Sequence, residues 1–395
     1  MGLLPDPDFV LRSSFTPTVG YLDSATYGLP PSAALAELAT VTAAWAVGNY
    51  DPVRCDEAVS RARTSFARLH GVPAANVAIG HQVSPLVALV AGSMRRGAHV
   101  LAAEGDFTSL LFPFLAGGCA VESVPLDRIA PAIDARTELV AVSAVQSADG
   151  RLADLASIGS AAAHHGALTV IDATQASGWL PLDASQFDVL VAGGYKWLCH
   201  PRGTAFITVR PKLRDRLVPA AAGWYAGECP WDTCYGTPLR LAADARRFDV
   251  SPAWFSWHAA AAALELFEEH GIERIHQHDV ALANRLRAGL DLPRGDSAIV
   301  SLAVDDSAGR RLASAGVTAS VRAGRVRLSA HVYNDQRDID RALEALSGTV
   351  AHSRPYATGN DDSSRRRGGS STAASRRRAT TQADELDHGD VGSLT

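Results

Sequence analysis

The stretch LTVIDATQASGW, residues 168–179, and the stretch DVLVAGGYKW, residues 188–197, decide the fold of this chain. Each begins as an apolar run of strand length and ends in polar residues, which is typical of a buried strand that leads into a loop. In doubly wound sheets, ligands bind outside the carboxyl ends of the strands. Asp172 and Lys196 are therefore expected at the same edge of a sheet. The pair predicts a buried salt bridge, a turn capped by the Asp, or a reactive site.

Strand-like segments alternate with alanine-rich segments of helical period on both sides of these two stretches. This alternation predicts an α/β fold with a mainly parallel sheet. The expected strands are 99–104, 139–145, 168–173, 188–194 and 204–209, and the expected helices are 31–49, 55–71, 84–94 and 155–166. Further along, a long helical run (254–290), two short strands (298–304 and 324–332) and a helix (335–346) are expected. We predict an N-terminal segment (1–35), a large domain (36–250), a small C-terminal α+β domain (251–351) and a disordered tail (352–395).

The composition is that of a globular protein, with 395 residues, 47% of them apolar, and a net charge of −5. This charge gives no general attraction for nucleic acid or for an anionic membrane. No apolar run reaches the roughly 18 residues of a membrane span, and the first residues lack the pattern of a secretory signal. The five cysteines form no CxxC pair and are odd in number, which favours a reducing compartment. We predict a cytoplasmic protein without a nucleic-acid or membrane partner.

Lys196 is one of only two lysines in a chain with 35 arginines. A pyridoxal phosphate (PLP) site needs an amine that binds the cofactor covalently and an anion beside the nitrogen of its ring. Lys196 and Asp172 match these two requirements. His276 and His278 lie two apart on an expected helix and face different sides, so we predict no metal site.

PLP also needs donors for its phosphate and a flat group over its ring. The helix that begins in AIGHQVSPLVALVAG, residues 78–92, offers free backbone N–H groups, with Gln82, Val83 and Ser84 at its start. Ser84 is explained equally well as an ordinary N-cap. Phe107 follows a strand end, where an aromatic ring could stack on the cofactor, although a core position is the commoner role.

A family resemblance covers residues 20–347, which is nearly everything except the tail. DATQASGW (172–179), AGGYKW (192–197) and HPRGTAF (200–206) together resemble the signature of class V aminotransferase-fold enzymes. This group includes cysteine desulfurase, kynureninase and isopenicillin N epimerase. The resemblance implies a fold type I enzyme that uses PLP, acts on a small amino-acid substrate and forms a homodimer with shared sites.

The resemblance assigns roles around the cofactor. Lys196 would carry it, Asp172 would pair with its ring nitrogen, and Gln175, helped by Ser147, would hydrogen-bond its phenolic oxygen. Phe107 stands where many relatives have a ring-stacking His, a departure that looks kynureninase-like.

The phosphate end departs further from the family pattern. Tyr195 replaces the His that often contacts the phosphate, and Gly193 replaces a usual Ser. Gln82, Ser84 and the backbone of Val83 would therefore matter more. RRFDVSPAWF, residues 246–255, resembles the segment in which a neighbouring subunit supplies a hydroxyl, here Ser251.

Two arginines are implied as substrate ligands. In SVRAGRVRLSAHVYN, residues 320–334, Arg327 matches the family's binder of the α-carboxylate, and Arg322 a second arginine near the substrate. A guanidinium holds a carboxylate through two parallel hydrogen bonds, which a lysine cannot do. Without the resemblance, an arginine on the surface of an edge strand would be expected.

The resemblance also narrows the reaction. Cysteine desulfurases carry a nucleophilic Cys on a loop between the two arginine segments, and here Arg322 and Arg327 are almost contiguous without a Cys. The segments AAGWYAGE (221–228) and RLAADARRFDVSPAWFSW (240–257) look most like the hercynylcysteine sulfoxide lyases of ergothioneine biosynthesis. The expected activity is a PLP-dependent carbon–sulfur lyase that acts by β-elimination.

Alternatives remain open at this point. Kynureninase-like, epimerase or aminotransferase activity is compatible with the same residues. A non-catalytic scaffold is a further alternative, against which the presence of both Lys196 and Asp172 argues. Trp224, Tyr225 and Trp254 could form an aromatic seat for a trimethylammonium group or could simply pack.

Overall fold

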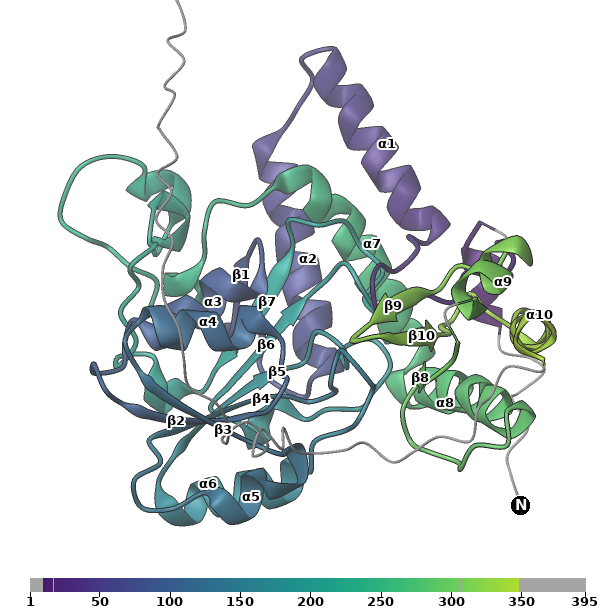
Figure 1. Ribbon diagram of the computed structural model, residues 1–395. Coiled ribbons are helices and arrows are strands. Elements are labelled where there is room, and N and C mark those ends of the chain that lie inside the picture. Colours follow the sequence, from purple (N-terminus) through teal and green to yellow (C-terminus); the bar gives the residue numbers. More distant parts are fainter. Residues whose placement is uncertain (1–9, 17, 306, 348–395) are drawn as a thin grey trace, which may run out of the picture. The chain divides into compact units, whose positions relative to one another are not determined.

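A seven-stranded sheet forms the centre of the fold (Figure 1). The computed structural model describes residues 10–16, 18–305 and 307–347. The strand order is β1-β7-β6-β5-β4-β2-β3, with β7 antiparallel to both of its neighbours and the other pairs parallel. The strands are β1 (Val77–Gly80), β2 (His99–Ala103), β3 (Ala120–Val124), β4 (Leu139–Ser143), β5 (Leu168–Asp172), β6 (Val189–Gly193) and β7 (Ala205–Val209).

Helices cover both faces of this sheet, so its central strands are buried on both sides. One face packs on α2 (Pro52–Leu69), α5 (Ile129–Ala132), α6 (Leu155–His165) and α7 (Trp254–His270), and the other on α3 (Val83–Ala91) and α4 (Thr108–Ala116). Side chains alternate between the two faces, as Val170 and Ile171 show by belonging to different core clusters. Burial on both faces explains why these strands appear as continuous apolar runs. Helix α1 (Ser32–Ala46) packs against α7.

A second, smaller sheet follows in sequence. Its strands are antiparallel in the order β8-β10-β9, with β8 (Ile299–Leu302), β9 (Ser320–Arg322) and β10 (Arg325–Ser329). Helices α8 (Ile272–Gly289), α9 (Ala308–Ser314) and α10 (Gln336–Leu346) pack with it around one core cluster. The N-terminal segment joins this sheet through bridges from Tyr21 to Thr318 and from Asp23 to Ser329.

The structure confirms the predicted fold class, an α/β large sheet with a small α+β part. The predicted strands and helices are found with small shifts at their ends, and Gly166, which caps the C-terminus of α6, has a φ of 72°. The run expected over 254–290 is broken at Gly271, whose φ of 80° ends α7 before α8 begins. Strands β1, β3 and β9 were not predicted. β3 is a half-exposed edge strand without a strong apolar pattern.

The predicted domain boundaries stay a prediction. The described residues all belong to one compact unit. Within it, α7, expected in the small domain, packs against α1 and α2. The predicted disordered tail lies outside the described residues. In the part of the chain that the structure describes, no helix is both long and apolar enough to span a membrane.

Candidate functional site

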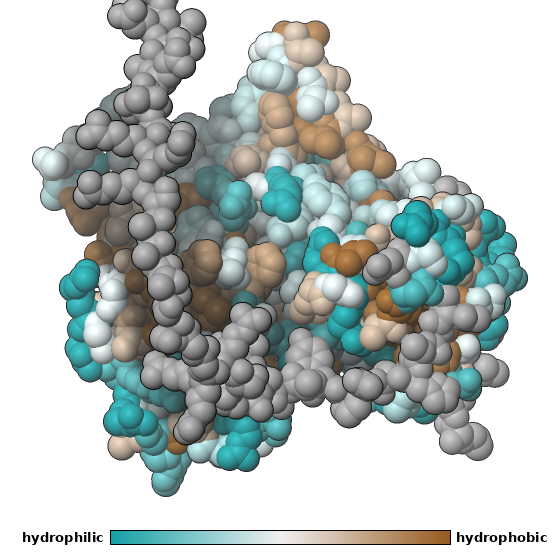
Figure 2. Space-filling view, viewed as in Figure 1, coloured by the Kyte–Doolittle hydropathy of each residue, from teal (hydrophilic) through white to brown (hydrophobic). Residues whose placement is uncertain are grey.

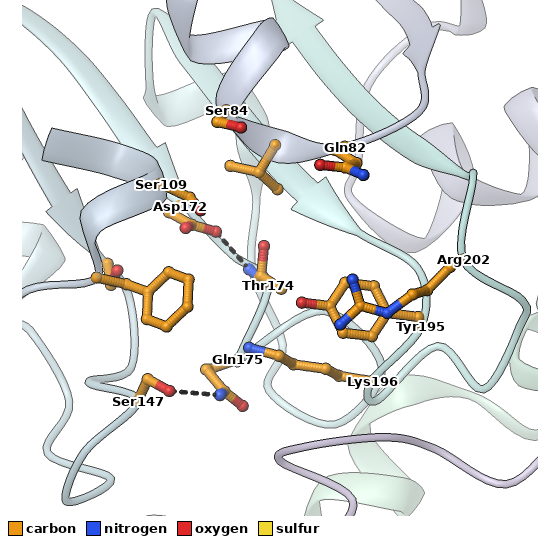
Figure 3. Close-up of a pocket in the computed structure, with 13 residues that line it drawn as sticks. Gln82, Ser84, Ser109, Ser147, Asp172, Thr174, Gln175, Tyr195, Lys196 and Arg202 are labelled. Atoms are coloured by element: carbon orange, nitrogen blue, oxygen red, sulfur yellow. Dashed lines mark hydrogen bonds between the residues drawn. The ribbon is translucent and has the colours of Figure 1, made fainter. Parts of the chain in front are cut away.

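A pocket opens at the carboxyl ends of β4, β5 and β6, where the sequence places the reactive residues (Figure 3). Its volume is about 220 Å³. The lining residues are Gln82, Val83, Ser84, Phe107, Ser109, Ser143, Ser147, Asp172, Thr174, Gln175, Tyr195, Lys196 and Arg202. Nine residues that the sequence singled out therefore come together in one cavity, from segments separated by more than 100 positions.

Lys196 reaches the pocket from the loop after β6 and is 6% exposed. Its Nζ lies 5.3 Å from the ring centroid of Phe107 and 5.7 Å from that of Tyr195. Burial lowers the pKa of Lys196 from 10.5 to about 8, because the charged ammonium loses its hydration. Asp172 raises this pKa, and Arg327, Arg202 and Arg322 lower it further. A substantial fraction of the amine is thus neutral near physiological pH.

Asp172 is the last residue of β5 and is buried. Its Oδ1 accepts a hydrogen bond from the backbone N–H of Thr174 at 2.8 Å, so it does cap the following turn. Burial raises the pKa of Asp172, while the Thr174 bonds and the charge of Lys196 oppose that rise. Among the described ion pairs none joins Asp172 to Lys196. The buried carboxylate therefore keeps the capacity to meet a cation inside the pocket.

Figure 3 shows the side chains of Gln175 and Ser147 next to the amine end of Lys196, and we call these two residues the floor of the pocket. The Nε2 of Gln175 donates to Ser147 Oγ and to the carbonyl of Ala25, both at 3.0 Å. Its Oε1 accepts from the indole N–H of Trp197 at 2.8 Å. Since the indole N–H can only donate, the oxygen end of the amide must face Trp197, and the nitrogen end faces Ser147 in the pocket lining.

Arg327 contacts Ser147 of this floor and is 1% exposed. One of its terminal nitrogens donates to two atoms of Ser147, the backbone carbonyl and the side-chain Oγ, the latter at 3.2 Å. The other terminal nitrogen donates to Thr26 Oγ1 at 2.7 Å. The nearest carboxylate, Asp23, is 3.8 Å away, and the Nε of Arg327 has no hydrogen-bond partner. Burial lowers the pKa of Arg327 to about 10. The guanidinium thus carries a charge that the surrounding residues only partly neutralise.

Ser147 receives hydrogen bonds from both Gln175 and Arg327. These two donors occupy the lone pairs of its oxygen, so its own hydroxyl hydrogen is free to donate to another acceptor. Because Ser147 lines the pocket, a negatively charged oxygen beside it would find a donor there.

The start of α3 forms the far side of the pocket. Gln82 is the N-cap residue, and its side chain makes no capping hydrogen bond. The first N–H groups of this helix, from Val83 and Ser84, therefore lack a side-chain acceptor from the cap, a setting that favours an anion. Ser84 is not the N-cap.

Four lining residues were missed by the sequence reasoning: Ser109, Ser143, Thr174 and Arg202. Ser143 is the last residue of β4 and could have been found by the same strand-end rule as Asp172. Arg202 belongs to the HPRG motif, and its guanidinium carbon lies 4.0 Å from the ring centroid of Tyr195. This stacking has no local sequence signal.

Several predicted residues lie outside the lining. Arg327 and Arg322 approach it from the β9–β10 hairpin, and both donate to Thr26 Oγ1, Arg322 at 3.1 Å. Ser251 is exposed and does not line this pocket.

The three aromatic residues considered as a seat for a trimethylammonium group do not line this pocket. Trp224, Tyr225 and Trp254 pack together with Trp231 around the carboxylate of Asp56. Within the described residues, no group of three or more His, Cys, Asp or Glu could hold a metal ion.

Comparisons with known proteins agree with this geometry. The model of the aminotransferase class-V family matches residues 120–342. An uncharacterized aminotransferase of Bacillus subtilis is 30% identical over 320 residues, which cover 74% of this chain and 84% of that protein. Isopenicillin N epimerase of Streptomyces clavuligerus is 28% identical over 341 residues, covering 73% of this chain and 84% of the epimerase.

Solved structures confirm the fold. The cystine C–S lyase C-DES, solved with its product cysteine persulfide, has a TM-score of 0.76 at 19% identity, covering 85% of this chain and 98% of C-DES. In another structure of C-DES, with a TM-score of 0.77, glycine is covalently linked to the PLP cofactor. With a family model that matches more than half of the sequence and a relative covered over most of its length, the chain belongs to the aminotransferase class-V family.

Proposed function

We propose that this protein is a PLP-dependent carbon–sulfur lyase that cleaves the β-carbon–sulfur bond of an S-substituted cysteine sulfoxide. One observation carries the proposal: a buried amine of lowered pKa and a buried carboxylate line one pocket, and an incompletely paired guanidinium, that of Arg327, bonds Ser147 in its lining. Family relatives include isopenicillin N epimerase, and the cystine C–S lyase C-DES shares the fold.

The lining fits PLP group by group. Lys196 supplies the amine and Asp172 the anion for the ring nitrogen, while the start of α3 offers N–H groups to the phosphate. Ser147, with its free hydroxyl hydrogen, would donate to the phenolic oxygen, and Gln175 would hold Ser147 in place. Phe107 and Tyr195 lie near Lys196 and would bound the space for the ring. When bound, PLP supplies an electron-accepting ring next to the α-carbon of the substrate.

The chain's own residues then perform the remaining steps. Arg327, which retains an unpaired Nε, would bind the α-carboxylate, with Arg322 near it. Lys196 would accept the proton from the α-carbon of the substrate at Nζ. Loss of that proton allows the β-carbon–sulfur bond to break, and the sulfur leaves as a sulfenate. The remaining aminoacrylate hydrolyses to pyruvate and ammonia.

The β9–β10 hairpin supports a lyase rather than a desulfurase. Only Ala323 and Gly324 connect Arg322 to Arg325, with φ values of 48° and 72°. Such a two-residue turn needs positive φ and leaves no loop that could carry a mobile nucleophile. The sulfur would therefore leave without attack by a protein thiol from this hairpin.

Hercynylcysteine sulfoxide is the substrate that we propose, with ergothioneine formed after two-electron reduction of the sulfenate by an external thiol. The similarity of segments 221–228 and 240–257 to that branch of the family supports this choice. Incubation with a panel of S-substituted cysteines and their sulfoxides, including this compound, tests it through the release of pyruvate. Exchange of the α-hydrogen with solvent without pyruvate would instead identify an epimerase, and release of alanine from kynurenine a kynureninase.

A homodimer is part of the proposal. Helix α1 and the turn after it expose Leu35 (44%), Trp45 (61%) and Val47 (79%) to solvent. Figure 2 shows the resulting apolar surface where Figure 1 draws α1. An exposed cluster of this kind favours association, and Ser251 of one subunit would then reach the phosphate in the other. Light scattering is expected to give the dimer mass, and Ser251→Ala to weaken PLP binding; a monomer would contradict both.

A further inference from the structure

Asp279 and His331 form an ion pair outside the pocket that the proposed chemistry does not use. Both side chains are fully buried, and His331 Nδ1 lies 2.6 Å from Asp279 Oδ2. Asp279 comes from α8, and His331 follows β10. The rings of Trp197, Phe267 and Tyr333 surround the imidazole at centroid distances of 5.1, 5.6 and 5.7 Å. A charge pair in such an apolar setting costs desolvation energy, and Asp279 Oδ1 has no hydrogen-bond partner among the described residues, so the contact with His331 is the one that stabilises this buried carboxylate.

The contacts of His331 fix its protonation state. Nδ1 faces a carboxylate, and Nε2 lies 2.8 Å from the backbone carbonyl of Trp197. Both partners can only accept hydrogen bonds, so both ring nitrogens must carry a proton. The charge of Asp279 and the nearby Cys199 thiol raise the pKa of His331 to about 10, although burial opposes this. His331 is therefore an imidazolium across the physiological range.

The carbonyl that His331 holds belongs to the loop of Lys196. Three consecutive carbonyls in this loop accept hydrogen bonds: that of Tyr195 from Gly28 N at 2.9 Å, that of Lys196 from Cys199 N at 3.1 Å, and that of Trp197 from His331. Cys199 adopts a positive φ of 59°, which is unfavourable for a residue with a side chain. The surrounding contacts must hold the loop in this conformation.

The same loop orients Gln175. Trp197 donates from its indole N–H to Gln175 Oε1 at 2.8 Å, while its backbone carbonyl is bound by His331. Its ring and its backbone therefore link the ion pair to the floor of the pocket. Movement of Trp197 would release both Lys196 and the amide that positions Ser147.

We propose that Asp279 and His331 are positioning residues, a charged brace that holds the Trp197 carbonyl and thereby places Lys196 in the pocket and Gln175 beneath it. The brace acts through Trp197 and touches neither the cofactor nor the substrate. This positioning role depends on the proposed function in one respect, that Lys196 is the amine that binds the cofactor.

The two lysines of the chain allow a direct test. In full-length, cofactor-free protein labelled with carbon-13 at lysine Cε, two NMR signals report the titration of Lys196 and of Lys212. Lys212 is exposed and paired with Asp188 at 3.1 Å, so it serves as an internal reference. The test variant combines Asp279→Leu with His331→Leu, because removal of only one partner would leave a buried charge unpaired. His70→Leu is the matched control, since His70 is a buried histidine that bonds Ser177 and Phe66 but not the loop.

We expect the paired leucine variant to raise the pKa of Lys196 from about 8 toward 10.5, because a released loop lets water reach the amine. A full return to 10.5 would lower the neutral fraction of the amine at pH 7 roughly 300-fold. In the holoenzyme, the pH at which the visible absorption of bound PLP changes should shift as well. Lys212 in all proteins, and Lys196 in His70→Leu, should titrate as in the wild type.

Urea unfolding shows whether each variant remains folded. A folded leucine variant in which Lys196 keeps its pKa of about 8 would overturn the brace and leave the ion pair as a purely structural element. Long-range proton–nitrogen NMR adds a second check in the wild type: His331 should show two protonated ring nitrogens from pH 6 to 9, and a single protonated nitrogen would also refute the proposal. Neither NMR readout depends on activity, so failure of the lyase assay would leave this test intact.

Discussion

Arg327→Lys tests whether the substrate is an amino acid. Arg327 is 1% exposed, its Nε has no partner, and it bonds Ser147 and Thr26 while Asp23 remains 3.8 Å away. A lysine keeps the charge but loses the planar fork that binds a carboxylate with two parallel hydrogen bonds. A lost charge-assisted contact costs about 1.5–3 kcal/mol, which weakens substrate binding roughly 10- to 150-fold.

The assay compares an amino-acid substrate with the corresponding amine that lacks the carboxylate. The amino acid should show the full loss, and the amine almost none. Arg325→Lys is the matched control, because Arg325 lies on the same strand but bonds Ser301 at 2.9 and 3.0 Å. PLP affinity should be unchanged in both variants. Equal losses for the two substrates would refute the carboxylate role of Arg327.

Four further predictions concern the cofactor site and the pH dependence of the protein. Lys196→Ala should abolish turnover while leaving the urea midpoint near that of the wild type; a variant that still holds PLP covalently after borohydride reduction would contradict the role of the lysine. Asp172→Asn should retain PLP but lose most activity, since a neutral amide does not stabilise a protonated ring nitrogen, and near-normal rates would show that no such pairing is needed. Capture of PLP by the cofactor-free protein should accelerate with rising pH through about 8, because the pKa of Lys196 is lowered and only the neutral amine reacts; a pH-independent rate would argue against Lys196. Burial lowers the pKa of His70 to about 4 and that of His200 to about 3, so the unfolded state binds more protons than the folded state between pH 6.5 and 4. The free energy of unfolding should therefore fall as the pH drops through this window, and His70→Gln should reduce the slope, as urea titrations at several pH values would show.

The position of the pocket follows from strand periodicity. Strands buried on both faces are continuous apolar runs, so the ends of β5 and β6 are visible in the sequence, and with them Asp172 and Lys196. Parallel strands bring those ends to one edge, which made their proximity predictable. The roles of Gln175, Arg327 and Ser251, in contrast, came from the family resemblance and not from local pattern.

The break between α7 and α8 and the partner of the aromatic residues could not be predicted from the local sequence. Gly271 stands between two stretches of equally good helical period, and only the packing of α7 and α8 shows that the helix breaks there. Trp224, Tyr225 and Trp254, for which a substrate seat and simple packing were both open, pack around Asp56, whose carboxylate accepts from Tyr225, Trp231 and Trp254. A set of aromatics in a sequence does not reveal which polar partner their N–H and O–H groups will find.

The sequence by itself determined the α/β fold and the edge of the sheet at which the lysine and the carboxylate emerge, because both depend on periodicities of a few residues. Only the tertiary structure decided how that edge is held. His331 bonds the Trp197 carbonyl across 134 positions, and Arg327 reaches Ser147 across 180. Hydrogen bonds over such separations depend on how the small sheet and its helices pack beside the large one, and that packing is set by the whole core and not by the residues around either partner.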